Sequence, residues 1–218
     1  MFGRLFKANP LKANPFRANP LRANPLRASP GQQAAEVLYD AIVAQARRPS
    51  FYTACGVPDT LDGRFELVVL HAFLTFRRLE AAGAETADFA QLLFDVLFRD
   101  MDRSLREIGV GDLSVGKKVR TMAEAFYGRV KAYERALQAP ERVQGGDQEG
   151  SELEAALRRN LYGTTEPKPA QLAVVADYLR RESEALAAQS TAALLAGEIV
   201  FGEAPEAPLP QAPRQART

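Results

Sequence analysis

The chain has 218 residues and a mass of 23.8 kDa, with 46% apolar and 25% charged residues, the composition of an ordinary globular protein of one or two domains. One cysteine, Cys55, and one histidine, His71, exclude an internal disulfide, a CxxC redox pair and a zinc site made from these residue types. The net charge of +1 hides a basic arm on an acidic body, because residues 1–30 carry six basic side chains and no acid, which leaves −5 for the rest.

The arm is a pentapeptide repeat, Phe/Leu-Lys/Arg-Ala-Asn/Ser-Pro, present in five copies from Phe6 to Pro30. A proline at every fifth position prevents both a helix and a central strand, so residues 1–30 are predicted to be disordered. The basic side chains allow three interpretations: weak attachment to an anionic membrane surface, contact with RNA phosphates, or a solvated tail without a fixed partner. The Pro/Ala-rich tail, residues 203–218, is also predicted to be disordered.

Between these ends, residues 31–202 are predicted to form one helical domain. Apolar residues recur there with the helical period, and no segment alternates with period two, so the predicted fold class is all-α, an irregular multi-helix bundle. A polar linker at about 139–150 divides the domain, and no apolar run is long enough to cross a membrane. The expected helices span residues 32–47, 63–82, 86–108, 114–138, 151–162 and 167–189, followed by a short apolar piece at 191–201.

Several helix ends have clear signals. Ser151 and Glu154 have the spacing of a capping box, in which each side chain bonds the backbone N–H of the other residue. Gly83, Gly109 and Gly163 follow periodic segments at the positions where a left-handed residue ends a helix. These signals predict four helix ends, which belong to three of the expected helices.

The sequence offers little for catalysis. Gly111–Lys118 has the spacing of a phosphate-binding loop, but Lys118 stands where Ser or Thr must hold Mg²⁺, so we expect a connection between two helices. His71 lies in an apolar run and is predicted to be a satisfied core histidine. Cys55 is predicted to be a buried, unreactive thiol. No catalytic residue, cofactor or metal site is predicted.

The expected helix 86–108 carries two apolar rows and one unusual acid. Asp100 projects into the row of Phe89, Val96 and Leu97, so we predict that it is largely buried and paired with a cation, with Arg64 as the first candidate. Another apolar row on the same helix can pack on a neighbouring helix or meet a client protein; it consists of Phe94, Phe98, Met101 and Leu105.

Two segments carry a family resemblance. Phe51–Glu66 leads into the apolar helix with His71, and Phe98–Asp112 continues through Gly116-Lys117-Lys118 to Ala125–Arg129. Together they resemble the ubiquinol–cytochrome c chaperone family, the assembly factors of the cytochrome bc1 complex.

The resemblance implies a helical, non-enzymatic chaperone that holds newly made cytochrome b at the membrane surface while the complex assembles. Family members in mitochondria work with a small helical co-chaperone at the ribosome exit, and the basic arm is not part of the family pattern. The residues expected to bind the client or a partner lie in the two segments: Val57, Pro58, Asp59, Asp62, Arg64, Asp100, Asp102, Arg103, Arg106, Asp112, Lys117 and Lys118.

Two other functions stay open at this stage. A small helical enzyme would use His71 and the Asp/Arg cluster, and would need His71 exposed in a polar cleft. An RNA- or ribosome-binding module would act through the arm. A concave apolar groove near Gly56–Arg64 and Asp100–Lys118 would favour the chaperone. Because arginine outnumbers lysine 22 to 6 and the arm is a poor transit peptide, we expect a bacterial protein on the cytoplasmic face of the inner membrane, or the matrix side if it is mitochondrial.

Overall fold

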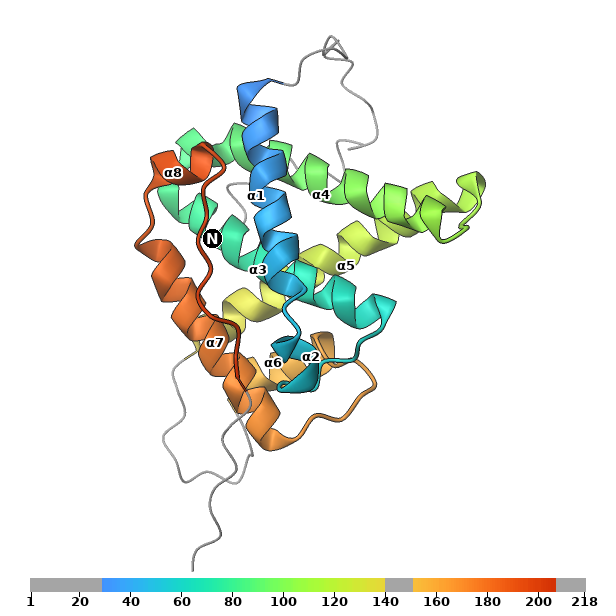
Figure 1. Ribbon diagram of the computed structural model, residues 1–218, viewed down its shortest axis with the longest axis vertical. Helices are drawn as coiled ribbons and strands as arrows, with labels where there is room; N and C mark the ends of the chain where they lie inside the picture. Colours follow the sequence, from blue (N-terminus) through green and yellow to red (C-terminus); the bar gives the residue numbers. More distant parts are fainter. Residues whose placement is uncertain (1–28, 140–150, 207–218) are drawn as a thin grey trace, which may run out of the picture.

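The computed structural model describes residues 29–139 and 151–206. Residues 1–28 of the arm, nearly all of the predicted linker and most of the predicted tail lie outside the described residues. Ser29 and Pro30, predicted to belong to the disordered arm, instead cap and begin the first helix, because proline is accepted in a first helical turn. Within the described residues the chain is helical and contains no strand, which confirms the all-α prediction (Figure 1). The elements are α1 (Pro30–Ala46), α2 (Ser50–Thr53), α3 (Leu61–Ala82), a short 3-10 turn (Ala84–Thr86), α4 (Ala87–Glu107), α5 (Asp112–Gln138), α6 (Glu152–Asn160), α7 (Pro169–Ala187) and α8 (Thr191–Leu195).

The six long helices agree with the predicted ones to within two residues at each end. The capping box of Ser151 and Glu154 is formed, and Gly83, Gly109 and Gly163 have positive φ angles of 98°, 87° and 58°. The predicted apolar piece at 191–201 is only partly helical, because α8 ends at Leu195 and an extended segment follows. The short helix α2 was not predicted, since four residues show no period.

Helix α3 is the centre of the bundle and packs against α1, α4, α5 and α7. Its residues 66–76 are all buried, as expected for a helix with neighbours on every side. Thr60 caps its first turn by accepting a hydrogen bond from the N–H of Gly63. A side chain at Gly63 would collide with the carbonyl oxygen of Pro58, so this glycine lets the 57–60 loop fold tightly onto α3.

Helices α4 and α5 form a long hairpin whose tip projects from the body (Figure 1). Near the body, the rings of Phe94 and Phe98 meet Phe126 of α5 at centroid distances of 6.1 and 6.0 Å. Met101 is also buried, and Leu105 is partly buried against the core. The second apolar row of α4 therefore packs on the neighbouring helix α5. Of the two alternatives, packing on a helix or meeting a client protein, the first is confirmed.

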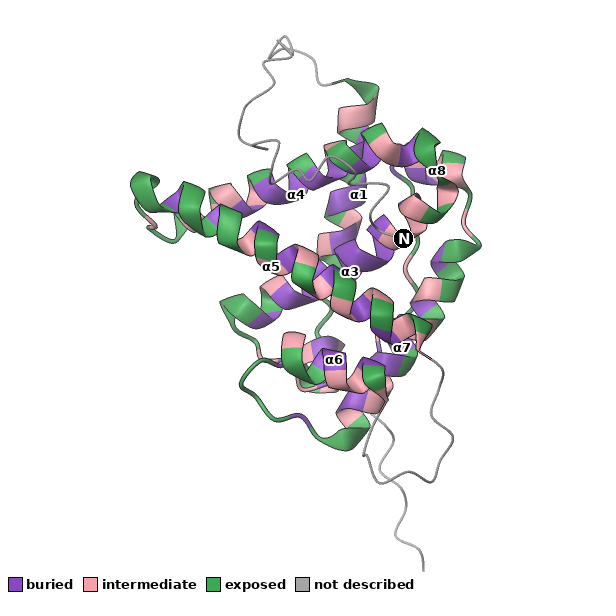
Figure 2. Cartoon of the chain, turned by 180° about the vertical axis from the view of Figure 1, so that it is seen from behind, coloured by how far each residue is buried: buried purple, intermediate pink, exposed green. Residues whose placement is uncertain are grey.

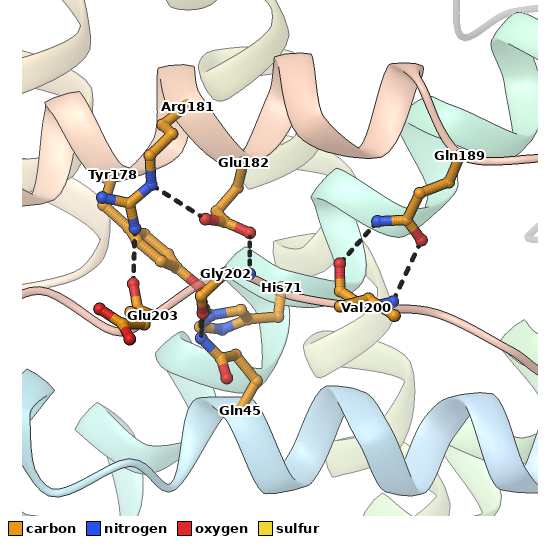
Figure 3. A network of polar contacts seen from close by, with 9 residues as sticks. All are labelled: Gln45, His71, Tyr178, Arg181, Glu182, Gln189, Val200, Gly202 and Glu203. Carbon is orange, nitrogen blue, oxygen red and sulfur yellow. Dashed lines mark hydrogen bonds and ion pairs between the residues drawn. The ribbon is translucent and has the colours of Figure 1, made fainter.

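After α8, the extended segment 197–206 returns along α7 and α1. Gln189 bonds both backbone groups of Val200, and Gln45 and Glu182 bond the carbonyl and the N–H of Gly202 (Figure 3). Gly197 and Glu198 still donate backbone hydrogen bonds to Leu194 and Ala193 of α8, and beyond them these side-chain contacts satisfy backbone groups of the irregular segment, since the described residues contain no strand to pair with it.

Among the described residues, no helix is long and apolar enough to cross a membrane, and no group of three or more His, Cys, Asp or Glu side chains could hold a metal ion.

Candidate functional site: a charged groove between α1 and α4

A groove of about 400 Å³ lies where α1 and α4 pack together. Its walls come from residues at spacings of three and four on α1, and from a similar run on α4, so each helix turns one face toward the opening. The lining is polar and charged around two valines: Glu36, Tyr39, Asp40, Val43 and Arg47 of α1, and Val96, Arg99, Asp100 and Arg103 of α4. This groove is not the apolar one near Gly56–Arg64 and Asp100–Lys118 that would favour the chaperone: it is charged, and only Asp100 and Arg103 of those segments line it.

The floor of the groove is a hydrogen-bonded pair that joins the two helices. The hydroxyl of Tyr39, a residue only 5% exposed, donates to Oδ2 of Asp100 at 2.8 Å. Burial, and then the negative charge of Asp100, raise the pKa of Tyr39 far above its ordinary value, so the hydroxyl keeps its proton and remains a donor. Arg103 donates to Oδ1 of Asp100 at 2.5 Å.

The partner of Asp100 differs from the predicted one. Arg103, one turn along the same helix, is the cation, whereas Arg64 pairs with Asp59 at 2.7 Å on the loop before α3. The helical phase correctly turned Asp100 inward, but its side chain remains 22% exposed, and Arg103 and the Tyr39 hydroxyl satisfy it without a cation from another element.

Two charges at the groove have no ion-pair partner in the described part of the chain. Arg47 is exposed at the end of α1, and Asp40 lies two turns earlier on the same face, about 10 Å away along the axis. Arg99, in contrast, pairs with Glu36 across the groove at 3.3 Å. Judged by the ion pairs within residues 29–139 and 151–206, the groove presents one free cation and one free anion to a partner.

Arg47 also connects the groove to the first predicted segment. Burial raises the pKa of Tyr52, and the charges of Arg64 and Arg47 oppose that rise. Arg47 acts in the same way on Tyr39 at the groove floor. It therefore lies within electrostatic reach of both the groove and Arg64 at the start of α3, although Asp100 and Arg64 do not meet.

The predicted site residues fall in three places, and their role as client contacts stays a prediction. In the loop before α3, Val57 is a core residue at 2% exposure, Pro58 is half-buried and Asp59 is exposed, while Asp62 and Arg64 are exposed at the start of α3. Asp100 and Arg103 line the groove. The remaining five lie toward the hairpin tip, where Arg106 pairs with both Asp102 and Asp112, and Lys117 and Lys118 are exposed.

His71 is a structural residue, as predicted. It is 0% exposed, with Nδ1 2.7 Å from the carbonyl oxygen of Leu67 and Nε2 2.8 Å from the hydroxyl of Tyr178. This assigns the proton to Nδ1 and makes Nε2 the acceptor from Tyr178, whose oxygen in turn accepts from Gln45 at 2.9 Å (Figure 3). Burial lowers the pKa of His71 to about 4, so the ring is neutral at pH 7.

Both ring nitrogens of His71 are therefore occupied, and no polar cleft reaches them, which removes the observation that the enzyme alternative required. Cys55 is also fully buried, and burial raises the pKa of its thiol to about 11, so it stays protonated and unreactive as predicted.

Sequence reasoning missed the contribution of α1. Tyr39 and Asp100 are 61 positions apart, and nothing local links them. A signal was nevertheless present: Glu36, Asp40, Val43 and Arg47 follow one another at spacings of four, three and four, which places them on one stripe of the helix.

Comparisons with known proteins agree with one another. A family model described as "Ubiquinol-cytochrome C chaperone" matches residues 53–201. The chain is 24% identical over 169 residues to ubiquinol-cytochrome-c reductase complex assembly factor 1 of Xenopus laevis, covering 77% of this chain and 80% of that protein. The mouse protein of the same description is 24% identical over 167 residues, which is 76% of this chain and 54% of the mouse protein, so the match spans about half of its length.

A solved structure supports the same relationship. The crystal structure of the Cbp3 homolog from Brucella abortus superposes with a TM-score of 0.68 at 36% sequence identity, covering 80% of this chain and 91% of that one.

Proposed function

Because this chain belongs to the ubiquinol–cytochrome c chaperone family, we propose that it is a non-enzymatic chaperone that binds newly made cytochrome b and promotes assembly of the cytochrome bc1 complex. The observation that carries the proposal is the family match over residues 53–201, which contains the second segment of the resemblance and all of the first except Phe51 and Tyr52. The vertebrate relatives are described as assembly factors of this complex, which supports the same role.

A holding role is physically sensible for such a client. Cytochrome b buries its haems between apolar helices, so an unassembled chain exposes surface that aggregates or is degraded. A protein that binds this state withdraws it from both fates by mass action, and this requires an interaction surface and no catalytic group. Such work is done at the membrane, and we propose that the protein acts at the cytoplasmic face of the inner membrane in a bacterium.

The groove between α1 and α4 is the surface we assign to the client. Its charges suit a polar segment of cytochrome b outside the bilayer better than a membrane-spanning helix. Arg47 and Asp40 would each gain a partner of opposite charge, and the Tyr39–Asp100 pair would hold the floor in place. The apolar valines, Val43 and Val96, give the groove a small desolvated centre.

The test is deletion of the gene followed by complementation. Loss of the protein should lower haem-loaded cytochrome b and quinol–cytochrome c reductase activity without lowering the cytochrome b transcript. Arg47→Glu should fail to restore activity fully, because it reverses the one cation of the groove that has no ion pair among the described residues. Arg135→Glu, which makes the same charge change at an exposed position on α5 away from the groove, is the matched control and should restore activity.

Two results would count against the proposal. Normal b-type haem spectra and normal reductase turnover in the deletion strain, under growth that requires the complex, would remove the assembly role itself. Equal complementation by Arg47→Glu and Arg135→Glu, with both proteins present at normal levels, would keep the assembly role but remove the groove as its site.

A further inference from the structure

The end of the α4–α5 hairpin exposes apolar side chains that the fold does not use. Leu113 is fully exposed and Ile108 is 57% exposed, and they flank the turn between the two helices. Figure 2 shows this tip, residues 108–118, as a mainly exposed projection beyond the body. A leucine with its whole side chain in water gains nothing from this fold, so the tip offers apolar area to something outside the chain.

The charged side chains at the tip that have no ion-pair partner among the described residues are positive. Arg106 pairs with both Asp102 and Asp112, and Arg103 pairs with Asp100 and lies 3.8 Å from Glu107. Each of these acids therefore has a cation beside it, although the two arginines do not balance all four negative charges. Lys117 and Lys118 are exposed on the first turns of α5 and have no ion-pair partner among the described residues. Lys117 follows Leu113 by four positions and so lies on the same side of α5.

We propose that this tip is a membrane-docking element, in which Leu113 and Ile108 enter the interface of an anionic bilayer while Lys117 and Lys118 contact the lipid headgroups. Apolar side chains at the end of a projection, with lysines one turn behind them, have the arrangement of an interfacial anchor. Each lysine near a negatively charged surface adds to the attraction, and its long stem keeps the ammonium at headgroup level.

The shape of the tip favours a bilayer over a protein partner. A stable protein interface buries about 800 Å² on each side and is usually anchored by aromatic or arginine side chains in pockets. The tip is a projection with two aliphatic side chains, and the groove described above does not reach it. Two aliphatic side chains and two lysines give weak, reversible attachment to a membrane surface.

The sequence supplies a clean reporter for this proposal, because the chain contains no tryptophan. Leu113→Trp in the full-length protein places a single fluorophore at the tip. Vesicles with about 30% phosphatidylglycerol should shift its emission to the blue and protect it from a soluble quencher, and salt should weaken the effect. Val37→Trp, at a residue of α1 that is 58% exposed, is the control and should not respond. Inorganic phosphate at the same anion concentration should leave both unchanged.

Vesicle flotation tests the side chains themselves. Leu113→Asp should lower binding to the same vesicles about tenfold or more, and the double change Lys117→Glu with Lys118→Glu should lower it by about 30-fold or more. Lys131→Glu with Arg135→Glu reverses the same charge on α5, about 20 Å farther along the helix and beyond the Debye length of about 8 Å. This control should bind within about twofold of the unmodified protein. The arm is present in every variant, so any difference belongs to the hairpin.

A tip that stays solvated on vesicles, or equal responses of the two tryptophan variants, would overturn the proposal. If Leu113→Asp lowered reductase assembly in cells while the fluorophore of the Leu113→Trp variant remained exposed to quencher on vesicles, the tip would contact a protein, and the lipid assignment would be wrong. Neither result bears on the assembly role, which the deletion strain tests separately.

Discussion

Polar side chains have opposite surroundings in two regions: they are buried on the central helix α3 and exposed in the groove between α1 and α4. On α3, Glu66, His71 and Thr75 are all buried, and each has a partner within the chain. In the groove, Arg103 is 72% exposed, and Arg47 is exposed without an ion pair among the described residues. Buried polar groups must be satisfied internally because water cannot reach them, whereas exposed ones remain available to a partner. Changes on α3 should therefore lower stability, and changes in the groove should lower function.

The largest effect is expected for the buried ion pair on α3. Arg129 of α5 donates to both carboxylate oxygens of Glu66, which is 7% exposed. Arg129→Ala leaves this carboxylate buried without its cation and should lower the free energy of unfolding by about 3–5 kcal/mol at neutral pH, measured by urea denaturation.

The pH dependence of that loss is a second readout. Burial already raises the pKa of Glu66 above its ordinary 4.5, and removal of Arg129 should raise it further. A carboxyl with a raised pKa in the folded state favours folding at low pH, and this contribution is lost as pH rises above 4.5, so Arg129→Ala should be less destabilised at pH 5 than at pH 8. The double change Glu66→Leu with Arg129→Leu should be more stable than Arg129→Ala. An equal loss at both pH values would contradict the assignment.

A somewhat smaller effect is expected from His71. Its pKa is about 4 in the folded protein and 6.5 in a solvated chain, so the unfolded state takes up a proton more readily between these values. Stability is then complete above pH 6.5 and is lost as pH falls toward 4, by about 3 kcal/mol in total. His71→Gln should remove this part of the pH dependence in urea titrations from about pH 7.5 to about pH 4.5. If the variant and the unmodified protein showed the same slope, His71 would not be the titrating group.

The smallest effects on stability are expected in the groove. Arg103→Ala removes an exposed ion pair and should change the free energy of unfolding by less than about 1 kcal/mol. Asp100→Ala also removes the acceptor for Tyr39 and should cost about 1–2 kcal/mol, with Asp100→Asn restoring much of it. Both variants should nevertheless reduce reductase assembly in the complementation assay. If Asp100→Ala lowered the free energy of unfolding by about 4 kcal/mol, this carboxylate would behave like the buried polar groups on α3, and the difference between the two regions would not hold.

Much of the fold was accessible from local patterns. The periodicity of apolar residues located six helices, and residues such as Gly109 and Ser151 marked their ends, because capping and helical phase depend on neighbours within four positions. The same locality explains the error at Asp100. Helical phase showed that Asp100 turns inward. Whether Arg64 or Arg103 would pair with its carboxylate depended on where the start of α3, which carries Arg64, lies in space.

The sequence by itself determined the helical fold class, the exclusion of a zinc or disulfide framework, the buried states of His71 and Cys55, and the family resemblance. Only the tertiary structure decided that α1 joins α4 to make the groove, that Phe94 and Phe98 pack on α5, and that Leu113 is left in water at the tip. The reason is that a period of 3.6 residues in the sequence indicates the apolar face of a helix. Which neighbour covers that face is set by packing between segments far apart in the chain.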